Sequence, residues 1–391
     1  MQITREFILS APTEELIRAM LETYGSEENQ RRICEPERFR YLTGIGRPVF
    51  AKAFPFKTLD YYSDPDACLR AQLQWKLYTY HIIRDSAPLD LDVGVDYSTA
   101  YEPSLLGMKH TVKEGMEPTY GAPEMEEADE LHRLQKPDFF TSGLMPQAHA
   151  MYAALQQRVG DRLRVFFPGW SRGPWSIATI ARGFEGVFLD YKEEPDKLHK
   201  LMQFAVDSRI SWEKQRCAFL GIDPRDRTYR WNYIAYRHNT NSDLFEDEVD
   251  GNLFSLPLFR EMILPYEKQL CEFYGGIGYY HSCGNLTKFL DDIYSELDIF
   301  GVQHVSSWTD YDKAAEVVPQ NVTLQVSLHT TKETLGASDE TLENLMRSLM
   351  ERSRGHRVDI CADALYEGGW DTLERGAHLA RLFEKVMREG A

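Results

Sequence analysis

The sequence lacks the long apolar runs and paired cysteines that mark membrane and secreted proteins. No stretch of its 391 residues approaches the roughly 20 apolar residues that a membrane-spanning helix needs. The segment 1–20 is amphipathic, with Glu14 and Glu15 inside it, and it has no uninterrupted apolar core of a signal peptide. The six cysteines are widely spaced and include no C-x-x-C pair, which favours a reducing compartment over a disulfide framework. These absences predict a cytoplasmic protein that does not enter a membrane.

Positive charge is also in short supply. Lys and Arg number 44 against 61 Asp and Glu, so the net charge is −17. Such a chain repels phosphate backbones, which argues against nucleic acid as a ligand. Hydrophobic residues make up 43% of the chain, which is ample for a packed core and excludes a disordered protein.

Eight short segments rich in Val, Ile, Phe and Tyr have the composition of strands, and helix-like segments with apolar residues near i, i+3 and i+4 separate them. The predicted strands are 47–53, 89–95, 163–169, 228–234, 276–282, 298–305, 322–329 and 357–363. The clearest predicted helices are 64–85, 196–221, 257–275 and 339–355. Strands that alternate with helices indicate a parallel sheet, and eight such units favour an α/β fold of the (β/α)₈ TIM-barrel type.

The predicted domain organisation is a single barrel spanning 1–391. Residues 1–45 form an N-terminal helical extension in this interpretation. Residues 96–160, between the second and third predicted strands, are rich in proline and glycine and are predicted to be a loop-rich insertion.

The stretch "GIGYYHSCGN" places a histidine and a cysteine at the end of the fifth predicted strand. Loops that follow the strands form the active-site face of such barrels, so His281 and Cys283 are candidate site residues. Cys361, in "RVDICAD", lies near the end of the eighth predicted strand and is expected at the same rim. One imidazole and two thiolates would neutralise Zn²⁺ and leave a fourth position open, as in a catalytic zinc site.

The "HSCGN" motif with a later cysteine resembles the His-x-Cys…Cys zinc site of cobamide-dependent methyltransferases of the uroporphyrinogen decarboxylase superfamily. The segments 173–202 and 250–270 resemble that superfamily too, and the similarity covers roughly residues 45–385. The resemblance implies a zinc-dependent methyltransferase that moves a methyl group from a small-molecule donor to a corrinoid (cobalamin). A partner protein is expected to carry that corrinoid, because the chain has no convincing D-x-H-x-x-G motif of its own. The O-demethylase type, with a methyl ether as donor, is the favoured form.

The chain departs from the decarboxylases of this superfamily at "YLTGIGRPVFAKAF", where their arginine-rich segment is missing. Decarboxylation of a porphyrinogen is therefore less favoured, although it stays open as an alternative. Two further alternatives are a methylcobamide:thiol methyltransferase of the coenzyme M type and a non-catalytic corrinoid-binding module. The sequence does not fix the oligomeric state and is compatible with a homodimer.

Further candidates lie near the expected rim. Glu246, Asp247 and Glu248 follow the fourth predicted strand, where a carboxylate could complete the zinc shell or act on the substrate; a solvated loop is the alternative. A second set shares strand-end positions and is expected to line a pocket for a methoxy compound, with plain packing as the alternative. This second set comprises Tyr97, Trp170, Trp175, Tyr279, Tyr280, His304 and Trp308.

Overall fold

A six-stranded parallel sheet forms the centre of the molecule. The computed structural model describes residues 2–54, 56–228, 230–231 and 239–390. The strands are hydrogen-bonded in the order β1-β12-β11-β10-β9-β8, with every neighbouring pair parallel. Their bounds are β1 Phe39–Ile45, β8 Leu244–Phe245, β9 Ile277–His281, β10 Ile299–Val305, β11 Thr323–Leu328 and β12 Val358–Leu365.

A separate parallel pair, β2 (Asp92–Gly94) and β5 (Arg164–Phe166), extends this arrangement. The chain after β5 meets β8, because the Phe245 amide donates to the Ser171 carbonyl at 2.9 Å and the Gly173 amide donates to the Phe245 carbonyl at 2.9 Å. On the other side, the chain leading into β2 meets β1 where the Ser86 amide donates to the Tyr41 carbonyl at 2.8 Å. The molecule therefore has a TIM-barrel-like α/β fold, which confirms the predicted fold class.

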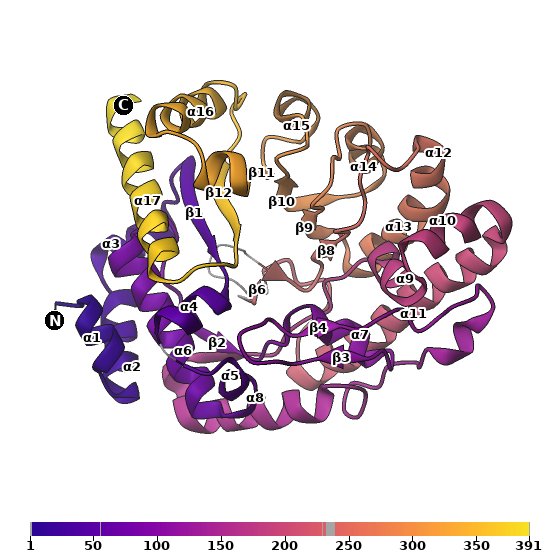
Figure 1. Ribbon diagram of the computed structural model, residues 1–391, viewed down its shortest axis with the longest axis horizontal. Coiled ribbons are helices and arrows are strands. Elements are labelled where there is room, and N and C mark those ends of the chain that lie inside the picture. The colour runs from indigo at the N-terminus through magenta and orange to yellow at the C-terminus, as the bar shows by residue number, and fades with distance from the viewer. Residues whose placement is uncertain (1, 55, 229, 232–238, 391) are drawn as a thin grey trace.

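Helices lie outside the strands and cover their outer faces (Figure 1). The helices are α1 Arg5–Ser10, α2 Thr13–Tyr24, α3 Glu27–Cys34, α4 Arg47–Ala53, α5 Thr58–Ser63, α6 Pro65–Tyr78, α7 Tyr101–Leu105, α8 Met145–Val159, α9 Pro174–Arg182, α10 Phe184–Glu193, α11 Pro195–Leu220, α12 Leu256–Leu258, α13 Leu264–Tyr274, α14 Leu290–Glu296, α15 Tyr311–Val317, α16 Asp339–Glu351 and α17 Trp370–Gly390. The C-terminal helix α17 packs beside β1 and α4, which brings the two ends of the chain to the same side of the barrel (Figure 1). No helix in the described ranges is long and apolar enough to cross a membrane.

The predicted strand 47–53 is wrong, since these residues form helix α4. Gly46 is the N-cap of α4, and proline stands in its first turn, where a missing amide hydrogen costs nothing. The first strand of the sheet is instead β1, which begins at Phe39, inside the segment interpreted as a helical extension. Its partner is β12, with Leu42 opposite Cys361.

The fourth predicted strand, 228–234, is displaced. Its residues 229 and 232–234 lie outside the described residues, while Arg230–Trp231 forms β6 and pairs antiparallel with β7 (Asn239–Thr240). The fourth parallel strand in chain order is β8, which lies after the predicted segment. The segment 96–160 contains a short antiparallel pair, β3 (His110–Thr111) and β4 (Thr119–Tyr120), and ends in helix α8.

Candidate active site

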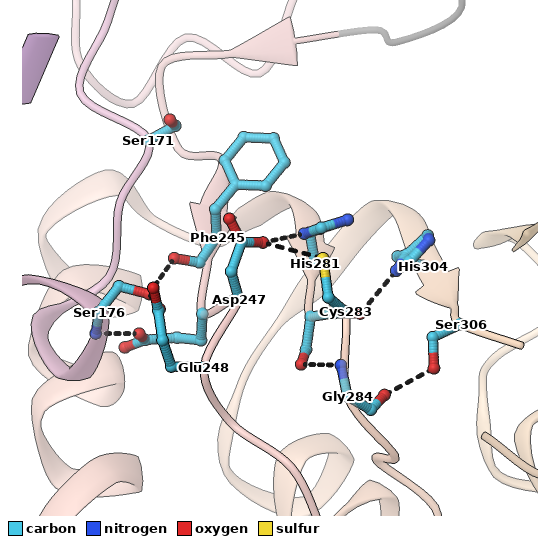
Figure 2. Close-up of polar contacts among 12 residues, drawn as sticks. Ser171, Ser176, Phe245, Asp247, Glu248, His281, Cys283, Gly284, His304 and Ser306 are labelled. Carbon is cyan, nitrogen blue, oxygen red and sulfur yellow. Dashed lines mark hydrogen bonds and ion pairs between the residues drawn. The ribbon is translucent and has the colours of Figure 1, made fainter. Parts of the chain in front are cut away.

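The carboxyl ends of β8 and β9 bring three metal-capable side chains together. Phe245 at the end of β8 lies in register with His281 at the end of β9, so the residues just after both strands are neighbours. Asp247, His281 and Cys283 each offer one ligand atom, and these atoms all lie within 4.8 Å of one another. Asp247 Oδ1 is 2.7 Å from His281 Nδ1 and 3.6 Å from Cys283 Sγ (Figure 2).

The loop that carries Cys283 is fixed from behind by hydrogen bonds. The Ser282 hydroxyl donates to the Val249 carbonyl at 2.6 Å and accepts from the Gly284 amide at 3.0 Å. The Ser306 hydroxyl donates to the Gly284 carbonyl at 2.6 Å (Figure 2). A Cβ at Gly284 would lie only 2.4 Å from the Val249 carbonyl oxygen, so the close approach of the two loops requires glycine.

The His281 ring is buried among aromatic rings. It stacks on His304 with 4.1 Å between ring centroids and meets the edge of Phe245 at 5.0 Å. The ring nitrogens of His304 are engaged elsewhere, with Nδ1 2.7 Å from the Ser282 carbonyl and Nε2 2.8 Å from the Ser327 hydroxyl. His304, expected to contact substrate, therefore supports the His281 ring.

The structure does not bring Cys361 into this group. Cys361 is buried inside β12, which runs on to Leu365, and it packs with Leu42 and Ala87. Strands β10 and β11 separate β12 from β9. Among the described residues, Asp247 takes the third place in the metal-capable group that the sequence assigned to Cys361.

Glu246 holds the start of a helix rather than facing the group. Its buried carboxylate accepts hydrogen bonds from the amides of Trp175 at 3.0 Å and Ser176 at 2.7 Å, in the first turn of α9. Burial raises the pKa of Glu246 well above its ordinary value, the nearby Glu267 carboxyl adds to the rise, and the two amides oppose it. Gly173 makes room for this carboxylate, because a Cβ there would lie 2.2 Å from it.

Glu248 and Arg172 lie on the other side of Asp247. Glu248 accepts a hydrogen bond from the Ser176 hydroxyl, and burial raises the pKa of Glu248 while Arg172 lowers it. Arg172 Nη1 is 3.8 Å from Asp247 Oδ2 and 3.7 Å from Glu248 Oε1. Burial alone would lower the pKa of Arg172, but the surrounding carboxylates raise it above its ordinary value. Sequence reasoning missed Arg172, although its place in "GWSRGPW", after the third predicted strand, is a signal that could have found it.

The aromatic residues predicted to line a pocket lie in three different surroundings. Tyr279 is the one whose ring reaches the group, with its centroid 5.7 Å from that of His281. Trp308 is 55% exposed and meets the edge of His329. The remaining aromatics are buried in packing contacts with other rings or with a carboxylate; they are Tyr97 against Tyr62, Trp170 against Trp212, Trp175 against Phe254, and Tyr280 bonded to Glu267.

Comparisons with known proteins agree with this architecture. Residues 52–215 match the family model described as uroporphyrinogen decarboxylase (URO-D). The structure of a methyltransferase from Methanosarcina mazei superposes with a TM-score of 0.59 at 16% identity, covering 88% of this chain and 91% of that one. A search of curated proteins finds no match. Residues 52–215 are thus similar to the uroporphyrinogen decarboxylase family, in agreement with the resemblance that the sequence suggests, and the chain shares the fold of the methyltransferase.

Proposed function

We propose that this protein is a zinc-dependent methyltransferase that moves a methyl group from a methyl ether to the corrinoid of a partner protein. The observation that carries the proposal is the group of Asp247, His281 and Cys283 at the carboxyl ends of two neighbouring strands. The uroporphyrinogen decarboxylase match and the shared methyltransferase fold support it.

The residues of this group fit a zinc ion. Imidazole nitrogen, thiolate sulfur and carboxylate oxygen are the ligand atoms that zinc takes in proteins, and three protein ligands leave room for a substrate atom. His281 Nε2 is buried and has no hydrogen-bond partner among the described residues, whereas Nδ1 lies 2.7 Å from Asp247 Oδ1. Buried polar atoms without partners are rare, so an ion at this point would satisfy an otherwise unexplained group.

The surrounding residues define what the site can do. A zinc ion held there would supply a Lewis acid that offsets the charge on the ether oxygen as its methyl group passes to the partner's cobalt, which gives the electron pair. Phe245 and Tyr279 flank the His281 ring with apolar surface. The loop contacts of Ser282 and Gly284 hold Cys283 in place, which preserves the geometry that the reaction needs.

The direct test combines metal analysis with a substrate screen. The purified protein should contain about one zinc per chain, and with a reduced corrinoid protein it should demethylate at least one methoxy compound, seen as the absorbance change from cob(I)alamin to methylcobalamin. Cys283→Ser should lose both zinc and activity. Cys34→Ser is the matched control, because Cys34 is also exposed but lies in α3, outside the group.

Two outcomes would redirect the proposal. Methylation of a thiol by the methylated corrinoid protein, without ether cleavage, would assign the reverse direction of transfer. Full activity on a porphyrinogen after chelation would replace methyl transfer by decarboxylation.

A further inference from the structure

Arg172 is buried in an unusual way. It is 7% exposed, yet its Nη1 makes no hydrogen bond to any residue that the structure describes. Two other buried arginines of the barrel, Arg209 and Arg216, donate to backbone carbonyls. Arg209 donates to the carbonyls of Ser171 and Asp243 at 3.1 and 2.7 Å, and Arg216 donates to the Phe167 carbonyl at 2.9 Å. A guanidinium nitrogen removed from water without an acceptor is costly, so Nη1 of Arg172 needs a further explanation.

The carboxylates beside Arg172 do not supply that explanation. At 3.7 and 3.8 Å they attract the guanidinium electrostatically but lie too far away for hydrogen bonds. Each is also engaged elsewhere, since Asp247 faces His281 and Cys283, and Glu248 accepts from the Ser176 hydroxyl. Nη1 is therefore a buried donor without an aligned acceptor, next to the side chains that form the metal-capable group.

The surroundings of Arg172 favour its charged form. The Tyr120 ring of β4 lies over the guanidinium at 5.7 Å, and such ring faces attract cations. The charges of Asp247 and the Cys283 thiolate would be offset by a divalent ion between them.

We propose that Arg172 binds a carboxylate of the small molecule, so that the methyl donor is a methylated carboxylic acid such as a methoxybenzoate. The planar guanidinium fork matches a carboxylate, and the charge-assisted bonds it forms are about twice as strong as neutral ones. Arg172 thereby selects the substrate, while Asp247, His281 and Cys283 provide the reaction centre. This inference rests on the proposed function only in placing the substrate at the same group.

Binding measurements test the inference without turnover. Calorimetry on the zinc-loaded protein compares 3- and 4-methoxybenzoate with the corresponding neutral methoxybenzamides. The wild type should bind at least one benzoate on the order of 10-fold more tightly than its amide. Arg172→Gln should weaken benzoate binding about 10- to 100-fold and leave amide binding and zinc content unchanged. Arg260→Gln is the control, because that arginine is 59% exposed in a surface ion pair with Asp292.

Three results would overturn the inference. Equal affinity of the wild type for benzoates and amides, or no benzoate binding at all, removes the anion preference. An equal loss of both ligands in Arg172→Gln would mean that Arg172 only shapes the pocket. Loss of zinc in that variant would mean that it acts through Asp247. Benzoate preference that depends on Arg172, in a protein that transfers no methyl group to a corrinoid, would uphold the inference and refute the proposed reaction.

Discussion

Asp247 lies between the other two members of the metal-capable group and Arg172. One carboxylate oxygen faces His281 and Cys283, and the other lies 3.8 Å from Arg172. A ligand that is also held by a neighbouring cation keeps its orientation when the metal leaves. We therefore expect the apo and zinc-bound forms to differ little in this loop.

The choice between Asp247 and Cys361 as the third metal ligand can be made by substitution. Asp247→Ala should lower zinc affinity by at least 10-fold, since changes even outside the ligand shell have effects of that size. Cys361→Ser should keep its zinc and lose some stability, because the thiol is buried against Leu42 and Ala87. Metal content after dialysis against a weak chelator measures both. Zinc retained by Asp247→Ala and lost by Cys361→Ser would restore the ligand set that the sequence suggested.

Glu267 gives a pH prediction of its own. Burial raises the pKa of Glu267 from an ordinary 4.5 to about 8, while the hydrogen bond from the Tyr280 hydroxyl lowers it. The folded protein then holds a proton that the unfolded chain releases, so the free energy of unfolding should fall as pH rises from about 4.5 to 8. The slope from this one group is at most about 1.4 kcal/mol per pH unit. In Glu267→Gln, urea unfolding across this range should show a shallower decline, and an unchanged slope would contradict the assignment.

At the scale of elements, hydrogen bonds tie the start of α9 to the end of β8, next to the site. Glu246, at the end of β8, accepts two amide hydrogen bonds from α9, and Gly173 leaves space for its carboxylate. Gly173→Ala should push this carboxylate away and destabilise the protein by about 1–3 kcal/mol, as overpacking does. Gly369→Ala is the control, since its nearest neighbour atom would be 3.7 Å from the new Cβ. Equal melting temperatures for the two variants would show that Glu246 can move at no cost.

The elements that sequence patterns predicted well are those with strong periodicity or clear ends. Asp64 and Ser255 accept capping hydrogen bonds at the starts of α6 and α12, and Gly221 and Gly275 end α11 and α13 in the left-handed conformation. The apolar segments of β9 to β12 were found within a few residues. The segment 47–53 was misread because its Val and Phe have strand propensity, whereas a glycine N-cap and a first-turn proline decide for a helix.

The candidate site was predictable in part for a related reason. His281 and Cys283 are separated by one residue at a strand end, so their proximity is local and visible in the sequence. Whether Cys361 or Asp247 joins them depends on how far β12 continues and on where a two-residue strand such as β8 begins. The burial of Arg172 and the missing acceptor at its Nη1 are properties of the packed structure, although its place after a predicted strand is visible in the sequence.

At the scale of the whole molecule, the site lies at the carboxyl ends of the strands, where the barrel opens through its loops. In the proposed reaction, a partner that carries a corrinoid would approach from this face, since the methyl carbon would have to lie in line between the ether oxygen and the cobalt. Trp308 follows β10 on this face and is 55% exposed, which gives a partner a large apolar side chain to contact.

Removal of the metal should therefore abolish demethylation and leave binding of the corrinoid protein intact. Chelated protein is expected to bind the corrinoid protein with nearly unchanged affinity, because the exposed rim residues remain in place, but to lose ether demethylation, because no Lewis acid remains to offset the leaving oxygen. Trp308→Ala is expected to show the reverse pattern, with full zinc content and partner binding weakened by more than about 1 kcal/mol, as substitution of an interface tryptophan typically does. Binding by calorimetry and turnover by absorbance on the same samples measure both effects. Demethylation at an undiminished rate without zinc would refute the metal's role, and loss of partner binding on chelation would show that the metal also organises the rim.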